Sequence, residues 1–192
     1  MKHTQQGRSM IEMLGVLAII GVLSIGGIAG YSKAMTKYRV NKTADQISQL
    51  AQNIRTLYAS QKNYSTLNEN VIKKAHLAPE DMYENTNYTS LYNPFGGWVG
   101  VYASKKISNN DNKASGFVLW DVPQEACIEL LTQDWGGGSS SGLISFGNAE
   151  ATFAVYGCTG TSNYTCANEG VMPVNKAISI CSGQNGVGWK FY

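Results

Sequence analysis

Glu12 is the first residue whose chemistry stands out, because it lies at the start of a long uncharged stretch. Met13–Gly30 contains no charged residue and no proline. A carboxylate is costly in lipid or in an apolar bundle, and such residues usually have a partner. Glu12 therefore indicates a pairing site rather than an ordinary solvent-exposed acid.

Four cysteines form the second set of chemically distinctive residues, and all lie in the last third of the chain: Cys127, Cys158, Cys166 and Cys181. An even number beyond a membrane segment fits two disulfides in an oxidising compartment. Buried free thiols in a reducing cytosol are the alternative. Spacing alone leaves all three pairings of four cysteines open. The cysteines form no Cys-x-x-Cys motif, so we expect no zinc site.

Residues suited to catalysis are scarce. The chain has two histidines, His3 and His76, and His76 has no cysteine or aspartate at metal-ligand spacing. The glycines at 136–138 lack the Lys-Ser/Thr of a phosphate-binding loop. The 15 basic and 13 acidic residues leave a net charge of +2, which does not indicate a nucleic-acid partner. We expect no enzyme, no cofactor and no metal.

The apolar stretch itself predicts a membrane helix. Its roughly 18 residues make about 27 Å of helix, close to the thickness of the bilayer core. A cleaved secretory signal is one alternative, but the stretch is long for one and no small-residue cleavage site follows it. A plain signal anchor is another. The basic residues after the stretch would then favour a cytoplasmic body, whereas the cysteines favour an exported one.

The helix is expected to continue beyond the membrane, because residues 31–60 contain neither proline nor glycine. Apolar residues there recur every three or four positions, which predicts one buried helix face. That face comprises Val40, Ala44, Ile47, Ala51, Ile54 and Tyr58, widened by Leu50 and Leu57. Asp45, Gln49, Gln52 and Arg55 are expected to face water. One helix over residues 8–60 would be roughly 80 Å long.

The remaining residues are rich in Gly, Asn, Ser, Thr and Tyr, which favours turns and short strands. Asn93–Gly97 has strong turn chemistry. We expect helices at Leu67–His76 and Pro123–Gln133, a hairpin of Trp98–Ala103 with Gly116–Trp120, and a loop at Ser162–Val171. Further strands are predicted at Leu143–Phe146, Thr152–Tyr156, Ala177–Cys181 and Val187–Phe191.

Gly7-Arg8-Ser9-Met10-Ile11-Glu12 before an apolar run resembles the class III signal of type IV pilins and pseudopilins. The resemblance implies cleavage by a prepilin peptidase between Gly7 and Arg8, and N-methylation of Arg8. Glu12 is then the fifth mature residue, placed to pair with the N-terminal amine of a neighbouring subunit; neutralisation of Glu12 by Arg8 of the same chain is the alternative. Arg8 stands where the family usually has Phe, Met or Leu. Asn93–Gly97 and Pro123–Leu131 with Cys127 are similar to segments of type IVb pilins.

The resemblance also implies a fold and a domain order. The expected fold is α+β: a long N-terminal helix packed on an antiparallel sheet, with a disulfide-closed C-terminal region. Residues 1–7 would be a leader, 8–30 the transmembrane and polymerisation half of the helix, 31–60 its amphipathic half, and 61–192 a globular head. The expected disulfides are Cys127–Cys181, joining the 123–133 helix to a late strand, and Cys158–Cys166.

Function is expected to follow from assembly. The resemblance implies a structural subunit of a type IV pilus-like filament that supports adhesion, aggregation or motility. Its partners would be identical or related pilins, the prepilin peptidase, the inner-membrane assembly platform and the membrane. The chain would lie in the inner membrane with a periplasmic body before assembly, and in an extracellular pilus afterwards. The alternatives are a pseudopilin of a type II secretion system and a membrane-anchored binding domain that never polymerises.

Overall fold

A computed structural model describes residues 10–84, 90–104, 112–136, 141–149, 171–181 and 185–192, and the backbone alone of residues 164–166 and Asn185. The chain divides into two units, residues 1–38 and residues 39–192. Gly7, Arg8 and Cys158 lie outside the described residues.

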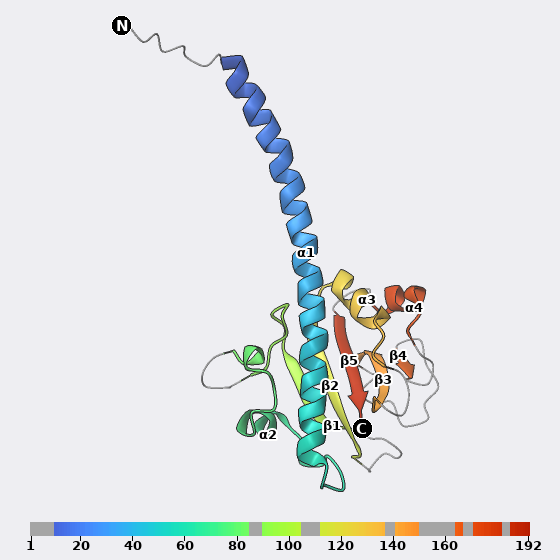
Figure 1. The fold of residues 1–192 in the computed structure, drawn as a ribbon. Coiled ribbons are helices and arrows are strands. Elements are labelled where there is room, and N and C mark those ends of the chain that lie inside the picture. The colour runs from blue at the N-terminus through green and yellow to red at the C-terminus, as the bar shows by residue number, and fades with distance from the viewer. Residues whose placement is uncertain are drawn as a thin grey trace. The chain divides into compact units, whose positions relative to one another are not determined.

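Helix α1 runs from Met10 to Tyr58 without interruption (Figure 1). The predicted continuation of the helix beyond the apolar stretch is therefore confirmed. Absence of proline and glycine between residues 31 and 58 permits it, since either residue would weaken a helix interior. The part of α1 in the first unit, residues 10–38, contains no buried residue.

The part of α1 in the second unit buries one face. Its buried residues are Val40, Thr43, Gln46, Ile47, Leu50, Ala51, Ile54 and Tyr58. The predicted apolar stripe is thus largely confirmed. Leu57 differs, because its side chain is 46% exposed, and Arg55 is half-buried rather than fully in water. Thr43 and Gln46 share the buried face although both are polar, which apolar periodicity could not indicate.

In the described part of the chain, five antiparallel strands form one sheet in the order β1-β2-β5-β3-β4. Their bounds are β1 Val99–Ser104, β2 Ala114–Val122, β3 Leu143–Asn148, β4 Tyr164–Cys166 and β5 Asn185–Phe191. The predicted hairpin is confirmed, with Val99 paired to Leu119 and Ser104 to Ala114. The last strand, β5, lies between β2 and β3 at the centre of the sheet.

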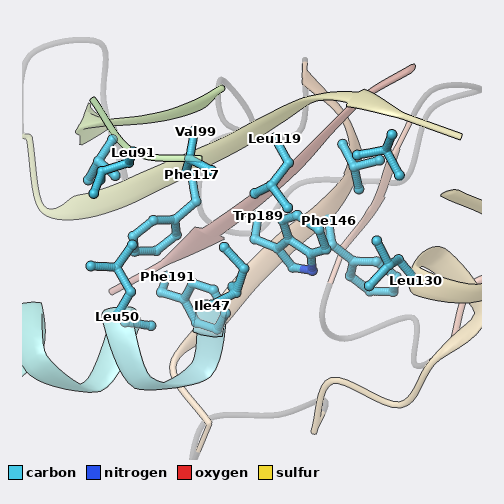
Figure 2. Packing of buried hydrophobic residues seen from close by; sticks show 14 of the residues in the cluster. Ile47, Leu50, Leu91, Val99, Phe117, Leu119, Leu130, Phe146, Trp189 and Phe191 are labelled. Atoms are coloured by element: carbon cyan, nitrogen blue, oxygen red, sulfur yellow. The ribbon is translucent and has the colours of Figure 1, made fainter. Parts of the chain in front are cut away.

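The core lies between this sheet and residues 39–58 of α1. Figure 2 shows Phe117, Trp189 and Phe191 between the strands and the helix that carries Ile47 and Leu50. Phe117 and Phe191 meet edge to face, with ring centroids 5.7 Å apart. Alternate residues of a strand point to opposite faces of the sheet. The apolar residues on one face of the strands therefore pack together against the helix. This two-layer packing confirms the predicted α+β fold.

Four short helices complete the described chain: α2 Glu69–Lys74, the 3-10 helix η1 Glu80–Met82, α3 Gln124–Thr132 and α4 Val174–Ile180. Asn68 caps α2, since its side-chain oxygen accepts a hydrogen bond of 3.2 Å from the Val71 N–H. Helices α2 and α3 lie where the sequence predicted helices. Helix α3 packs against α4 and β5.

The predicted strand Ala177–Cys181 is wrong, because this segment belongs to α4. Its alternation of apolar residues resembles a strand, but the buried residues are Ala177 and Cys181, four positions apart, as on one helix face. Pro173 at the N-cap is compatible with a helix start. The predicted loop Ser162–Val171 contains β4. The predicted strand Thr152–Tyr156 lies outside the described residues.

Candidate assembly site

The apolar part of α1 is exposed along its whole described length. All twelve large apolar residues from Met10 to Ile28 are exposed: Met10, Ile11, Met13, Leu14, Val16, Leu17, Ile19, Ile20, Val22, Leu23, Ile25 and Ile28. Removing such side chains from water is worth roughly 1.5–3 kcal/mol each when burial is complete. Complete burial of all twelve side chains would therefore be worth on the order of 20–35 kcal/mol.

This segment also meets the length and composition criteria for a membrane span. Within the described part of the chain, α1 is the one helix that is long and apolar enough, and none of its most apolar window is buried. The buried core helix of a soluble domain would meet the same criteria with most of its residues covered. The exposed surface of this segment is instead suited to lipid or to other apolar helices.

Glu12 lies in the first turn of α1 and is exposed. A carboxylate there interacts favourably with the positive end of the helix dipole. The two residues expected to form the cleavage site, Gly7 and Arg8, lie outside the described residues. The predicted roles of Gly7, Arg8 and Glu12 thus stay predictions.

Cys127 and Cys181 are joined by a disulfide with a Cα–Cα distance of 5.9 Å. This predicted pair is confirmed. Cys127 lies in α3, and Cys181 is the C-cap of α4, so the bond joins two helices rather than a helix and a strand. Both cysteines are buried in the core. The predicted pair Cys158–Cys166 lies outside the described side chains, although the backbone of Cys166 ends β4.

A salt bridge ties α1 to η1 in the second unit. Lys42 Nζ lies 2.7 Å from Asp81 Oδ2. Partial burial acts to raise the pKa of Asp81, but hydrogen bonds from Lys42 and Gln46 outweigh it, and the pKa falls below its ordinary value of 3.8. Asp81 is thus part of a structural contact between η1 and α1.

A pocket lies between α1 and the end of the sheet in the second unit. This pocket of about 200 Å³ is lined by α1 residues Ser48, Ala51, Gln52 and Arg55 together with Trp135, Ser141 and Phe191. Arg55 Nη1 donates a 2.8 Å hydrogen bond to the Ser141 carbonyl beside it. Among the residues searched, no group of three or more metal-ligating side chains is present. His76 is exposed just beyond the end of α2.

Comparison with solved structures shows which class of fold this is. The crystal structure of a type IVb pilin from Salmonella typhi matches with a TM-score of 0.52 and 16% sequence identity, covering 79% of this chain and 97% of that one. The crystal structure of TcpA, a type IV pilin from Vibrio cholerae, matches with a TM-score of 0.44 and 15% identity, covering 80% and 98%. The first match, together with the two-layer architecture, identifies a type IV pilin fold.

The family follows from a direct sequence comparison. The model of the Bundlin family matches residues 32–187, which is most of the chain. The chain therefore belongs to the Bundlin family of type IV pilins. A search of the curated proteins found no match. Residues 1–31, which carry the signal-like motif, lie outside the matched range, so motif and family match are independent observations.

Proposed function

We propose that this chain is the structural subunit of a type IV pilus-like filament and polymerises through the apolar half of α1. The observation that carries this proposal is the exposed apolar surface of residues 10–28 on a chain of the pilin family. Lipid would cover that surface before assembly. Neighbouring subunits would cover it afterwards, and the apolar surface would stay out of water in both states.

Glu12 gives the assembly its register in this proposal. After cleavage between Gly7 and Arg8, the new N-terminal amine is cationic below a pKa of roughly 8. Neither that amine nor Glu12 is stable alone among apolar helices, and pairing across subunits satisfies both. Each incoming subunit then settles at the axial position that brings the two charges together. N-methylation at Arg8 keeps the positive charge.

The second unit serves as the head on the filament surface. Its core includes residues 39–58 of α1, and its last helix is fastened by the Cys127–Cys181 disulfide. A disulfide persists in the periplasm and outside the cell, where the proposed topology puts the head. The filament would support adhesion, aggregation or motility. The partners proposed for its biogenesis are the prepilin peptidase and the inner-membrane assembly platform.

Mass spectrometry of the mature N-terminal peptide tests the processing step. The expected result is a peptide that begins at Arg8 and carries one added methyl group. The same preparation from cells lacking prepilin peptidase should begin with the leader. A mature chain that retains residues 1–7, or one cut after residue 30, would contradict the proposal. Cleavage without an added methyl group would contradict N-methylation of Arg8 but not the proposed role in assembly.

A further inference from the structure

Arg55 brings a positive charge into the pocket between α1 and the end of the sheet. Its side chain is half-buried, and its Nη1 donates a 2.8 Å hydrogen bond to the Ser141 carbonyl. A guanidinium has five N–H donors, and this bond uses one of them. Within the described part of the chain, Arg55 forms no salt bridge, and no acidic residue lines the pocket. Because partly buried charges favour a partner, the pocket is suited to an anion.

Gly142 holds the guanidinium in place. A Cβ added at Gly142 would lie 2.6 Å from both Cζ and Nη2 of Arg55, and 2.8 Å from Nη1. A side chain at this position would therefore displace the guanidinium. Gly142 also has a φ of 72°, a backbone conformation that favours glycine. Together with the bond to Ser141, this contact orders a long side chain before any ligand arrives, which lowers the entropic cost of binding.

Trp135 forms a fixed aromatic wall of the same pocket. Its Nε1 donates a 2.8 Å hydrogen bond to the Leu130 carbonyl. Its ring centroid lies 4.9 Å from that of Trp189, which is fully buried in the core. Since the indole N–H already has its acceptor, the ring offers the pocket apolar surface.

The size and the lining of the pocket limit what it can hold. Its volume is about 200 Å³. A cavity of about 150 Å³ can hold benzene, whereas drug-sized ligands occupy pockets of about 300 Å³ or more. Ala51 and Phe191 add apolar surface to that of Trp135, and Ser48 and Gln52 add polar groups. One ring that carries one charged group is therefore the size of ligand that fits.

We propose that this pocket binds a small aromatic carboxylate, that is, one planar ring that carries a single carboxylate group. The planar fork of the Arg55 guanidinium can donate two parallel hydrogen bonds to the carboxylate oxygens. The ligand ring would pack against Trp135 and Phe191, because aromatic rings attract one another in offset or edge-to-face arrangements. The charge and the apolar lining thus recognise different parts of one ligand.

Inorganic phosphate is the competing ligand, because the arginine fork also matches phosphate. Phosphate has oxygens on all sides, and each needs a hydrogen-bond partner or water. The apolar surfaces of Ala51, Trp135 and Phe191 provide no such partner. A carboxylate has both oxygens at one end, so the rest of the ligand can meet these surfaces. The lining therefore favours the aromatic carboxylate.

Fluorine NMR titration of 4-fluorobenzoate with the full chain in phosphatidylcholine nanodiscs tests the assignment, with empty nanodiscs as the blank. The neutral probe is 4-fluorobenzamide, which has nearly the same shape without the charge. Inorganic phosphate is added in a separate titration as a competitor. Saturable binding of 4-fluorobenzoate is expected, with a Kd in the millimolar range or tighter. The neutral amide should bind about tenfold more weakly or worse, because it lacks the charge-assisted hydrogen bonds.

Two substitutions of Arg55 separate its charge from its shape. Arg55→Gln should weaken binding of 4-fluorobenzoate about tenfold or more. Arg55→Lys keeps the charge and loses the planar fork, so it should weaken binding about fivefold. Arg39→Gln is the matched control, because Arg39 is an exposed arginine of the same helix that does not line the pocket. Its Kd should equal that of the unaltered chain. Thermal unfolding identifies the folded variants, and Arg55→Lys decides if Arg55→Gln does not fold.

The proposal is overturned if 4-fluorobenzoate does not saturate, or if 4-fluorobenzamide binds equally well. It is also overturned if the folded Arg55 variants bind normally, if Arg39→Gln weakens binding to the same extent, or if phosphate binds more tightly than 4-fluorobenzoate. The site lies within the second unit, and the titration uses unassembled chain. Its outcome therefore does not depend on whether the chain polymerises.

Discussion

At the scale of single residues, buried polar groups contribute to the stability of the head in addition to its apolar core. Asn93 illustrates this, because one side chain satisfies the backbone of its own turn and the carbonyl of Trp120. Buried groups that lose such partners cost about 1–3 kcal/mol each. The turn was visible in the sequence as Asn-Pro-Phe-Gly-Gly. Its attachment to β2, 27 positions away, was not, because no local pattern encodes that contact.

Replacing Asn93 with alanine should therefore lower the free energy of unfolding by about 2–4 kcal/mol. Asn93→Asp is the informative companion variant, because it keeps the acceptor and loses the donor to the Trp120 carbonyl. It should be no more stable than Asn93→Ala, since it also buries a charge. Chemical unfolding of the detergent-solubilised chain measures both. An aspartate variant as stable as the unaltered chain would show that the contact to Trp120 is unimportant.

The Lys42–Asp81 pair has a pH signature. The pKa of Asp81 in the folded chain lies below its ordinary value of 3.8, so the pair adds stability above that value and loses it as the pH falls through the folded pKa. The side chains are 34% and 46% exposed, so solvent screening limits the gain to about 0.5 kcal/mol. In thermal unfolding, the Asp81→Asn variant should thus have a slightly lower Tm than the unaltered chain at pH 7 and the same Tm at pH 2. An equal loss in Tm at both pH values would show that the substitution acts through packing rather than through the ion pair.

At the scale of elements, local periodicity predicted a helix or strand correctly where one face of that element packs against a single layer of the fold. The stripe from Val40 to Tyr58 and the strands of the β1–β2 hairpin are examples. Local pattern failed in the C-terminal region, where Ala177–Cys181 reads as a strand and forms α4. The deciding contacts there are the disulfide and the packing of α4 on α3, and both come from distant sequence.

The disulfide should accordingly matter most for this region. Its cysteines are 54 positions apart, and closing a loop of that size is worth about 4 kcal/mol in the loop-entropy account. The double variant Cys127→Ser/Cys181→Ser should lose 2–4 kcal/mol of stability in denaturant unfolding. Protease cleavage sites that appear on destabilisation should cluster in α3 and α4. A double variant with unchanged stability would contradict this role.

The second predicted disulfide can be tested separately. Peptide mapping of the non-reduced protein should find Cys158 linked to Cys166 in addition to the Cys127–Cys181 bond. A free thiol at Cys158, detected by alkylation without reduction, would contradict that pairing. Such a result would leave the confirmed bond and the head fold unaffected.

At the scale of the whole molecule, the two units differ in how much of their structure the sequence predicts. Residues 13–30 of the first unit carry no charge, so composition alone indicated an apolar surface that must be covered, and Glu12 beside them indicated a pairing site. The head is heterogeneous. Its sheet order places the last strand, β5, between β2 and β3, and this arrangement depends on contacts between distant segments that turn and strand patterns do not specify.

Polymerisation of the chain through residues 10–28, with Glu12 as the register residue, is the proposed basis of filament formation. Immunogold electron microscopy with antibodies against the head tests it most directly, in cells that express either the unaltered chain or Glu12→Val. Asp45→Ala, which changes an exposed acid on the same helix, is the control. We expect gold along filaments for the unaltered chain and the control, and membrane-inserted chain without filaments for Glu12→Val. Normal filaments from Glu12→Val, or gold confined to the cell envelope in every strain, would contradict it.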